Sequence, residues 1–459
     1  MKDILFEWNP WWANEYEFQG VSRDKTKDIL RWISRKEIIS ITGVRRAGKT
    51  TLLYEIIGYL INKNKISPKN ILFIKADDDR ADKDNLINHA IDEYYKWIAP
   101  QSRVFVFIDE IQEIREWQKT LKRHYDLDKN IKLFISGSNA DIMKEDLSSL
   151  LAGRCAYFDV FPFSFSEFLR AKGVAIKDDT GLIKEKNKIR HLLLEYVHNG
   201  SFPEVVLEKN EKIKNELAAF YFDSIFYRDV IKRKNIRNPA KLENLVKYFL
   251  QNISNLANFT KIAKAMELTT DSVVEYTKAL EDAYLLFHIN LLEFSYKKQI
   301  INPKKIYCVD TGIRNIVGFN FSEDIGRLYE NIVFMQLRRK AKEIFYWSGK
   351  NECDFIIKNG KRLEAVQVCW NIKQSKEREL KGLLEAMNKF KLKEGAIITE
   401  EYEFKEKFEN KIIRYIPLWK WLSIPLQEGL RTLVSKPLQE GFGTQVTKKF
   451  DFKSDRSYK

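Results

Sequence analysis

One short segment constrains the fold of this chain more than any other. The run EIISITG, from Glu37 to Gly43, is apolar and β-branched and ends in glycine, which is typical of a buried parallel strand. The stretch that begins at Thr50, TTLLYEIIGYLINK, has apolar residues at helical spacing. Between them, GVRRAGKT matches the pattern GxxxxGK[ST] in full. A strand, this loop and a helix together predict a phosphate-binding loop.

The residue types in the loop suit a nucleoside triphosphate and its metal ion. Glycines at both ends let the backbone wrap with its N–H groups pointing inward, and the following helix adds its positive N-terminal end. We expect Lys49 to reach the β- and γ-phosphates and Thr50 to ligate Mg²⁺, so the predicted cofactors are ATP and Mg²⁺. The residues expected to contact the nucleotide are Gly43, Arg45, Arg46, Ala47, Gly48, Lys49, Thr50 and Thr51.

A second apolar run, RVFVFIDE, ends in two carboxylates, Asp109 and Glu110. Open parallel sheets bind ligands at the carboxyl ends of their strands. We expect Asp109 to hold Mg²⁺, directly or through water, and Glu110 to polarise the attacking water as the catalytic base of ATP hydrolysis. Taken alone, an apolar strand that ends in two acids could be an ordinary strand end.

A third apolar run, IKLFI, is followed by Ser136, Gly137, Ser138 and Asn139. In a nucleotide-switch sheet this strand can lie between the other two and carry a polar side chain towards the γ-phosphate. Asn139, or else Ser138, is the candidate for that catalytic role. The alternative is a turn that is rich in Ser, Gly and Asn for loop reasons.

The alternation of strand and helix signals predicts the fold class as α/β, with a parallel sheet covered by helices on both faces. Residues 25–209 form this predicted ATPase domain, and strand signals disappear in a helical unit at 210–298. They return in a second α/β domain at 302–422. Residues 423–459 hold a twelve-residue duplication and a charged tail for which we expect disorder.

Composition limits the compartment and the partners. The four cysteines are far apart and form no CxxC pair, so they are expected to be reduced thiols in a cytoplasmic protein. No apolar run is long enough to span a bilayer, and no membrane partner is expected. The net charge of +15 favours acidic partners such as nucleic acid, although abundant Lys and Glu also fit a highly charged, solvated surface.

At this point the chain resembles a family of archaeal and bacterial AAA+ P-loop ATPases that carry a winged-helix unit and a restriction-endonuclease-like C-terminal domain. Besides the motifs above, the resemblance rests on LLAGRCAYFDVFPFSFSEFL and FYFDSIFYRDVIKR. It implies conformational change driven by ATP. It also makes Arg154 a candidate arginine finger or sensor, the alternative being a pair within its own subunit. Arg228 is a further candidate for the same role, and the alternative for it is an ordinary ion pair on its helix.

Within the helical unit, the segment from Ser254 to Tyr276 has the form of a helix-turn-helix. The resemblance implies a winged helix whose second helix would offer five side chains to a DNA major groove. Asp271 and Glu275 on the same helix would face phosphate unfavourably, so a scaffolding role is the alternative. The five expected contacts are Thr269, Thr270, Ser272, Tyr276 and Lys278.

The C-terminal domain departs from the nuclease pattern that the resemblance implies. Such nucleases gather acidic residues around Mg²⁺ and place a lysine beside the attacking water. Glu330 and Asp354 fit the first two acidic positions, and they form a possible second metal site. The next strand has Gln367 and Cys369 where a carboxylate and a lysine belong, and Glu364 points to the opposite strand face. We therefore expect a domain that is kept for binding or shape.

Three functions remain open from the sequence. The first is a Mg²⁺-dependent ATPase that changes conformation or assembles into a homo-oligomer on or near DNA. The second is a nucleotide-gated switch for a protein partner with slow turnover, and the third is an ATP-regulated nuclease with a degenerate metal site. Glu110 favours turnover, whereas the acidic helix favours a protein partner.

Overall fold

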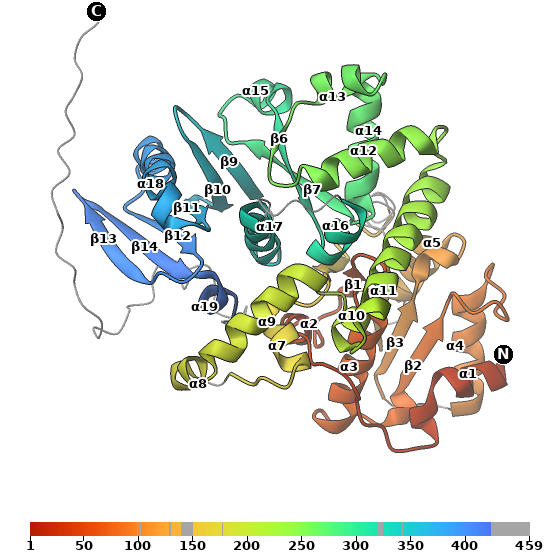
Figure 1. Cartoon of the computed structure of the whole chain (residues 1–459). Coiled ribbons are helices and arrows are strands. Elements are labelled where there is room, and N and C mark those ends of the chain that lie inside the picture. Colours follow the sequence, from red (N-terminus) through yellow and green to blue (C-terminus); the bar gives the residue numbers. More distant parts are fainter. Residues whose placement is uncertain are drawn as a thin grey trace, which may run out of the picture.

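The computed structural model describes residues 1–98, 100, 102–127, 130–138, 150–176, 178–318, 325–341 and 343–423. Among these residues the chain forms two β-sheets, which we call the N-terminal sheet and the long sheet, with helices around and between them (Figure 1). Most of the predicted duplication and the whole of the predicted tail lie outside the described residues.

The N-terminal sheet is wholly parallel, in the order β2-β3-β4-β1-β5. Strand β4 lies between β1 and β3, which confirms the expectation for the third apolar run. All residues of β1, β3 and β4 are buried, as a parallel sheet covered by helices requires. The strands are β1 (Ile38–Thr42), β2 (Ile71–Lys75), β3 (Val104–Asp109), β4 (Ile131–Gly137) and β5 (Cys155–Asp159).

Helices connect these strands in the predicted alternation. Helix α3 (Lys49–Asn62) links β1 to β2, α4 (Leu86–Ile98) links β2 to β3, and α5 (Trp117–Leu127) links β3 to β4. A second set precedes β1 or follows β5: α2 (Lys25–Leu30), α7 (Phe165–Ala171), α8 (Asp179–Lys184), α9 (Lys186–Asn199) and α10 (Pro203–Leu207). The parallel sheet with its helices is the fold of a P-loop NTPase, as the sequence predicts.

The N-terminal arm, α1 (Lys2–Trp8) and the 3₁₀ turn η1 (Pro10–Trp12), packs along the edge strand β2. The Asn9 side chain takes the place of a neighbouring strand. Its Nδ2 donates to the Phe73 carbonyl at 2.9 Å, and its Oδ1 accepts from the Phe73 N–H at 2.6 Å. The indoles of Trp11 and Trp12 donate to the Ile71 carbonyl. The arm therefore satisfies backbone groups that an edge strand would leave open.

A helical segment separates the two sheets, as the sequence predicts. Helix α11 (Glu211–Asp223) passes directly into η4 (Ser224–Lys232), a stretch of π-helix, and α12 (Pro239–Gln251) follows. In Figure 1, α11 lies between the N-terminal sheet and the elements of the long sheet. Long π-helical stretches are rare and often occur at functional sites.

The long sheet crosses the boundary that the sequence analysis places near residue 300. Its order is β13-β14-β12-β11-β10-β9-β7-β8-β6, and β7 pairs with β9 in parallel through Asn290 and Leu291. Strands β6, β7 and β13 were not predicted. The strands are β6 (Leu256–Ala257), β7 (Leu286–Leu291), β8 (Lys304–Cys308), β9 (Glu343–Ser348), β10 (Glu352–Asn359), β11 (Arg362–Cys369), β12 (Glu394–Thr399), β13 (Phe404–Phe408) and β14 (Lys411–Pro417).

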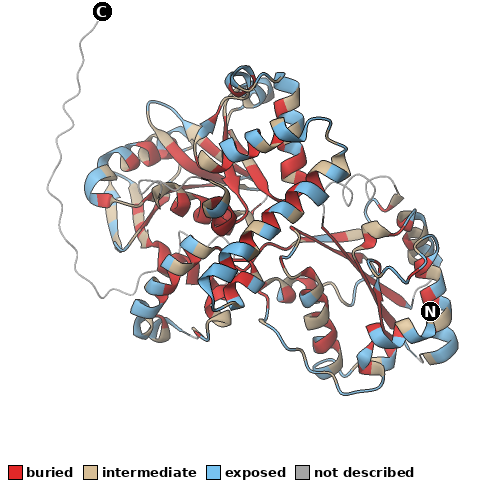
Figure 2. Cartoon of the chain, turned by 45° about the vertical axis from the view of Figure 1, so that its right-hand side comes forward, coloured by how far each residue is buried: buried red, intermediate tan, exposed pale blue. Residues whose placement is uncertain are grey.

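The helix-turn-helix and the C-terminal unit therefore share one sheet, and Figure 2 shows buried residues running along it. The hairpin β7–β8 follows the helix-turn-helix and carries the strand that contacts β9. The remaining helices are α13 (Phe259–Ala265), α14 (Thr270–Asp282), α15 (Tyr296–Ile301), α16 (Thr311–Val317), α17 (Ile325–Arg338), α18 (Ile372–Lys389) and α19 (Leu418–Ser423).

The Asn9 contact generates a stability prediction. Replacing Asn9 by Ala leaves the buried N–H and carbonyl of Phe73 without partners, so we expect the free energy of unfolding to fall by about 2 kcal/mol. Urea denaturation followed by tryptophan fluorescence measures the change. Asn64→Ala, at an exposed position, is the matched control and should change nothing. Equal midpoints for Asn9→Ala and wild type would show that the arm does not hold the edge strand.

Candidate functional site

The loop between β1 and α3 has the backbone that its glycines permit. Gly48 adopts φ +88° and Gly43 adopts φ +155°, and a Cβ at Gly43 would lie 1.9 Å from the Val160 carbonyl oxygen. Larger residues would therefore strain or displace the loop. Arg46 also has positive φ, at 67°. Its exposed side chain lies near Glu204 and the ring of Tyr221.

Lys49 places its ammonium inside the loop. Nζ donates to the carbonyls of Gly43 and Val44 at 3.1 and 3.2 Å, and the residue is only 4% exposed. Burial lowers the pKa of Lys49, although the nearby carboxylates of Glu110 and Asp109 act in the opposite direction. A buried ammonium without a bonded carboxylate favours an incoming anion, which is what a triphosphate supplies.

The two predicted carboxylates lie beside the loop, at the carboxyl end of β3. Thr50 Oγ1 donates to Asp109 Oδ2 at 2.7 Å, and the Ser136 hydroxyl donates to Asp109 Oδ1. Ser136 Oγ also accepts from the Glu110 N–H at 3.1 Å, so β4 fixes both acids. A hydroxyl and a carboxylate at this separation are the hard oxygen donors that Mg²⁺ prefers, and the residues therefore fit the predicted ion.

Burial and local charge set the protonation of the two acids in opposite directions. Burial, together with the nearby Glu110, raises the pKa of Asp109 above its ordinary value. Burial would also raise the pKa of Glu110, but Lys49, the Gln112 amide and Arg45 outweigh it and hold the pKa lower. Glu110 is therefore ionised at neutral pH, as a proton acceptor must be.

The other residues predicted for the loop are distributed unevenly. Ala47 is buried behind the loop, and Thr51 is exposed on the first turn of α3. Asn139 lies outside the described residues. Its neighbour Ser138 is buried, and its hydroxyl has no hydrogen-bond partner among the described residues, so this hydroxyl remains available near the end of β4.

Arg154 lies at the wrong end of the sheet for a sensor of its own nucleotide. Its carbonyl accepts from the Ile38 N–H, and the next residue, Cys155, pairs with Ile38 at the start of β1. The loop follows the other end of β1. The Arg154 guanidinium instead pairs with Asp126 at 3.3 Å. Because β5 runs parallel to β1, the residue before β5 must lie at the amino edge, away from the phosphates.

Sequence reasoning missed an ion pair between the loop and the helical segment. Arg45 Nε and Nη2 bind Asp229 Oδ2 and Oδ1 at 2.9 and 3.0 Å, and Asp229 is 1% exposed on η4. Arg233 lies 3.7 Å from the same carboxylate, and its buried Nη1 has no hydrogen-bond partner within the described residues. Arg228 points elsewhere, to Glu113 at 3.7 Å. The motif YRDVIKR is the only sequence signal, and it does not indicate the partner.

Arg23 was also missed, although it supports the loop from behind. Its guanidinium donates to the carbonyls of Ala47 and Phe161 at 2.7 and 2.6 Å and pairs with Glu167 at 3.1 Å. All of these groups are buried. Nothing in the residues around Arg23 predicts this contact, because its partners lie up to 144 positions away in the chain (from 23 to 167).

The expected DNA-reading helix, α14, uses part of its predicted contact set for its own cap. Thr269 Oγ1 accepts from the Ser272 N–H and bonds the Ser272 hydroxyl at 2.8 Å. Thr270, Lys278 and the two acids Asp271 and Glu275 are exposed. Tyr276 is half-buried. The exposed face of α14 therefore mixes both charges.

The second predicted metal site brings Glu330 and Asp354 together around a lysine. Lys305 Nζ lies 2.9 Å from Glu330 Oε1 and 3.0 Å from Asp354 Oδ1. Burial and the nearby Asp354 raise the pKa of Glu330 to about 8. Among the described residues there is no group of three His, Cys, Asp or Glu side chains that could hold a metal ion. The two predicted acids share the ammonium of Lys305.

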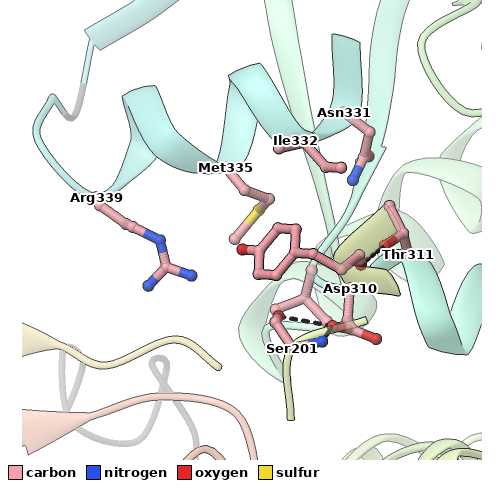
Figure 3. Close-up of a pocket in the computed structure, with 9 residues that line it drawn as sticks. Ser201, Asp310, Thr311, Asn331, Ile332, Met335 and Arg339 are labelled. Carbon is pink, nitrogen blue, oxygen red and sulfur yellow. Dashed lines mark hydrogen bonds between the residues drawn. The ribbon is translucent and has the colours of Figure 1, made fainter. Parts of the chain in front are cut away.

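A small pocket lies where α9, α16 and α17 meet, away from the phosphate loop (Figure 3). Asp310 is its buried acid, and it accepts from the Ser201 N–H and hydroxyl at 2.6 and 2.7 Å. It also caps α16 through the Ile313 N–H. Because these partners satisfy the carboxylate, its role is structural.

No helix in the described part of the chain is long and apolar enough to cross a bilayer.

Three segments match known protein families. Residues 35–169 match a family described as an AAA domain. Residues 190–324 and 325–421 match two families described as domains of unknown function, DUF8612 and DUF4143. The chain also resembles a solved structure, the Walker-type ATPase PABY2304 of Pyrococcus abyssi, at 12% identity and a TM-score of 0.40, over 66% of this chain and 96% of that chain.

Curated relatives match almost the whole chain. An uncharacterized protein of Haemophilus influenzae is 28% identical over 414 residues, which cover 87% of this chain and 98% of that protein. The uncharacterized protein MJ1544 of Methanocaldococcus jannaschii is 34% identical over 441 residues, which cover 92% of this chain and 95% of that protein. Because the likeness to MJ1544 extends over nearly the full length of both proteins, this chain belongs to the same family, with an AAA-type P-loop ATPase domain that binds nucleotide as its N-terminal part.

Proposed function

We propose that this protein is a Mg²⁺-dependent ATPase that couples hydrolysis to movement of its helical segment against the N-terminal sheet. One observation carries the proposal. Thr50, Asp109 and Glu110 lie together beside Lys49, at the carboxyl edge of the sheet. A domain that only bound nucleotide would not need an ionised, half-buried glutamate after the metal-binding aspartate.

The chain's own groups divide the chemistry. Lys49 and the backbone N–H groups of the loop would hold the phosphates, and Thr50 and Asp109 would hold the metal ion. Bound Mg²⁺ would supply Lewis-acid neutralisation of the phosphate charge. Glu110 accepts the proton of the attacking water through a carboxylate oxygen, and the Gln112 amide bonds that carboxylate and orients it.

Substitution of the two central residues tests hydrolysis. We expect Lys49→Ala to abolish ATP binding, because the buried ammonium is the main charge in the loop. We expect Glu110→Gln to keep ATP binding and to lower kcat by about 100-fold or more, since only the proton acceptor is lost. Phosphate release measures turnover, and fluorescent ATP measures binding.

Exposed residues of the same types provide the controls. Lys63→Ala, at the far end of α3, and Glu116→Gln, on the surface before α5, should leave both quantities unchanged. Full turnover by Glu110→Gln would remove the glutamate from the mechanism. Unchanged ATP affinity in Lys49→Ala would remove the nucleotide site itself.

The coupling part rests on Arg45. Asp229 holds this loop residue in a part-buried, two-point ion pair, whereas among the described residues Lys49 donates only to the carbonyls of Gly43 and Val44. An incoming triphosphate offers Arg45 a competing anion of higher charge. Arg233 lies 3.7 Å from the same Asp229 carboxylate, and its Nη1 has no hydrogen-bond partner among the described residues. Nucleotide binding would therefore draw both arginines away from Asp229 and change the packing of η4.

Asp229→Asn tests this competition. The substitution keeps the side-chain shape but removes the charge that holds Arg45, so we expect the Kd for ATP to fall about five-fold. It should also weaken the change in hydrogen exchange that ATP causes in η4. Asp223→Asn, exposed at the end of α11, is the matched control. An unchanged or higher Kd in Asp229→Asn would show that Asp229 does not compete with nucleotide.

DNA is the partner that we propose for the ATPase, because the net charge of +15 and the exposed Lys278 of α14 favour a polyanion. Asp271 and Glu275 favour the second candidate, an ATP-gated contact with a protein partner. That partner could be a second copy of this chain, which would give a homo-oligomer. A salt series with duplex and single-stranded DNA separates these functions. Stimulation of ATP turnover that fades with salt supports DNA, and its absence supports a protein partner.

A further inference from the structure

Lys305 is one of the buried charges in the described part of the second half of the chain. It lies on β8, its side chain is 2% exposed, and its ammonium contacts three carboxylates. The distances from Nζ are 2.7 Å to Glu352 Oε1, 2.9 Å to Glu330 Oε1 and 3.0 Å to Asp354 Oδ1. Two of these acids are the ones that the sequence predicts as metal ligands.

The number of donors matches the number of acceptors. A lysine ammonium has three N–H donors and no acceptor, and here three carboxylate oxygens lie within hydrogen-bond distance. The acids have further partners of their own. Tyr307 donates to Glu330 Oε1 at 2.8 Å, and the Val368 N–H donates to Asp354 Oδ2 at 2.9 Å. The cluster is therefore complete without another ligand.

Burial makes the ammonium part of the folded structure. The side chain of Lys305 is 2% exposed, and the side chains of Asp354 and Glu330 beside it are 9% and 14% exposed. Ionised acids grouped this closely would repel one another without a cation among them. The ammonium therefore compensates the charge of its neighbours.

The remaining positions of the expected metal site carry no replacement ligand. Gln367 uses its amide oxygen to accept from the Asp354 N–H at 3.0 Å and its Nε2 to donate to Glu379 at 2.5 Å. Cys369 lies beside the Ser375 hydroxyl at 3.5 Å. A catalytic lysine would keep a donor for water, whereas Lys305 donates to Glu330 and Asp354 and also pairs with Glu352. The residues present therefore do not fit Mg²⁺ with an activated water.

We infer that Lys305 is the built-in cation of this carboxylate cluster and occupies the position at which a divalent metal would otherwise bind. The lysine comes from the hairpin after the helix-turn-helix, while Glu330 comes from α17 and both Glu352 and Asp354 from β10. Lys305 precedes residues 319–324, which lie outside the described residues, and the three acids follow them. The ammonium therefore links two described parts of the chain. The cluster is therefore a structural ion-pair network and not an exchangeable metal site.

Manganese binding to wild type is the first test, and it requires no altered lysine. Nucleotide-free protein is titrated with Mn²⁺, and bound ion is counted by electron paramagnetic resonance in wild type and in Asp354→Asn. We expect the two titrations to agree. A bound ion that wild type holds and Asp354→Asn loses would overturn the inference, because the cluster would then take a metal in the presence of its lysine.

Removal of the lysine is the second test. We expect Lys305→Ala to lower the melting temperature by about 10 °C, since it leaves buried carboxylates uncompensated. We expect millimolar Mn²⁺ to recover at least half of that loss, and to recover nothing when Asp354→Asn is added. Chelation with EDTA should not change the melting temperature of wild type.

Lys304→Ala is the matched control, because Lys304 is the preceding buried lysine and donates to the backbone carbonyls of Gln299 and Ile300. Its loss of stability should not respond to Mn²⁺. Failure of Mn²⁺ to stabilise folded Lys305→Ala would overturn the equivalence of lysine and metal. If Lys305→Ala does not fold with or without Mn²⁺, the comparison of wild type with Asp354→Asn decides the question.

Discussion

The buried ammonium of Lys49 is the constraint on which the nucleotide site depends. It is held inside the loop by two carbonyl oxygens and has no carboxylate in direct contact among the described residues. The acids of β3 offset its charge from a distance, and they are themselves fixed by Thr50 and Ser136. An anion that enters the loop therefore meets a charge that the fold has desolvated in advance.

Two of the buried lysines among the described residues, Lys49 and Lys305, show opposite solutions to the same electrostatic problem. Among the described residues Lys49 has only two backbone carbonyls as direct partners, so its charge is available to a ligand. Lys305 has three carboxylates as direct partners, so its charge is already used. The N-terminal lysine therefore belongs to a site that can accept a ligand, whereas the C-terminal lysine belongs to a cluster whose charges are already paired.

The sequence predicts the parts of the fold and site that are local in the chain. The loop from Gly43 to Thr50 and the acids that end β3 are each specified by a few neighbouring residues, and the structure brings them together through the strand order. Arg154 precedes β5, a strand that the sequence analysis does not predict, and it therefore lies at the amino edge of the sheet, away from its own subunit's phosphates. The pairs Arg45–Asp229 and Lys305–Asp354 span 184 and 49 positions, and no pattern in one partner identifies the other.

The pairing of β7 with β9 has a mechanical consequence. Because Asn290 and Leu291 of β7 pair with Phe345 and Tyr346 of β9, the hairpin and the C-terminal strands form one continuous sheet. Residues that flank this sheet contact the ATPase domain at two points. The Tyr284 hydroxyl donates to Thr42 Oγ1, directly before Gly43. Arg339, which follows α17, donates to the carbonyls of Pro162 and Phe163. If nucleotide binding moved either contact, the displacement would be transmitted along the continuous sheet as far as β13.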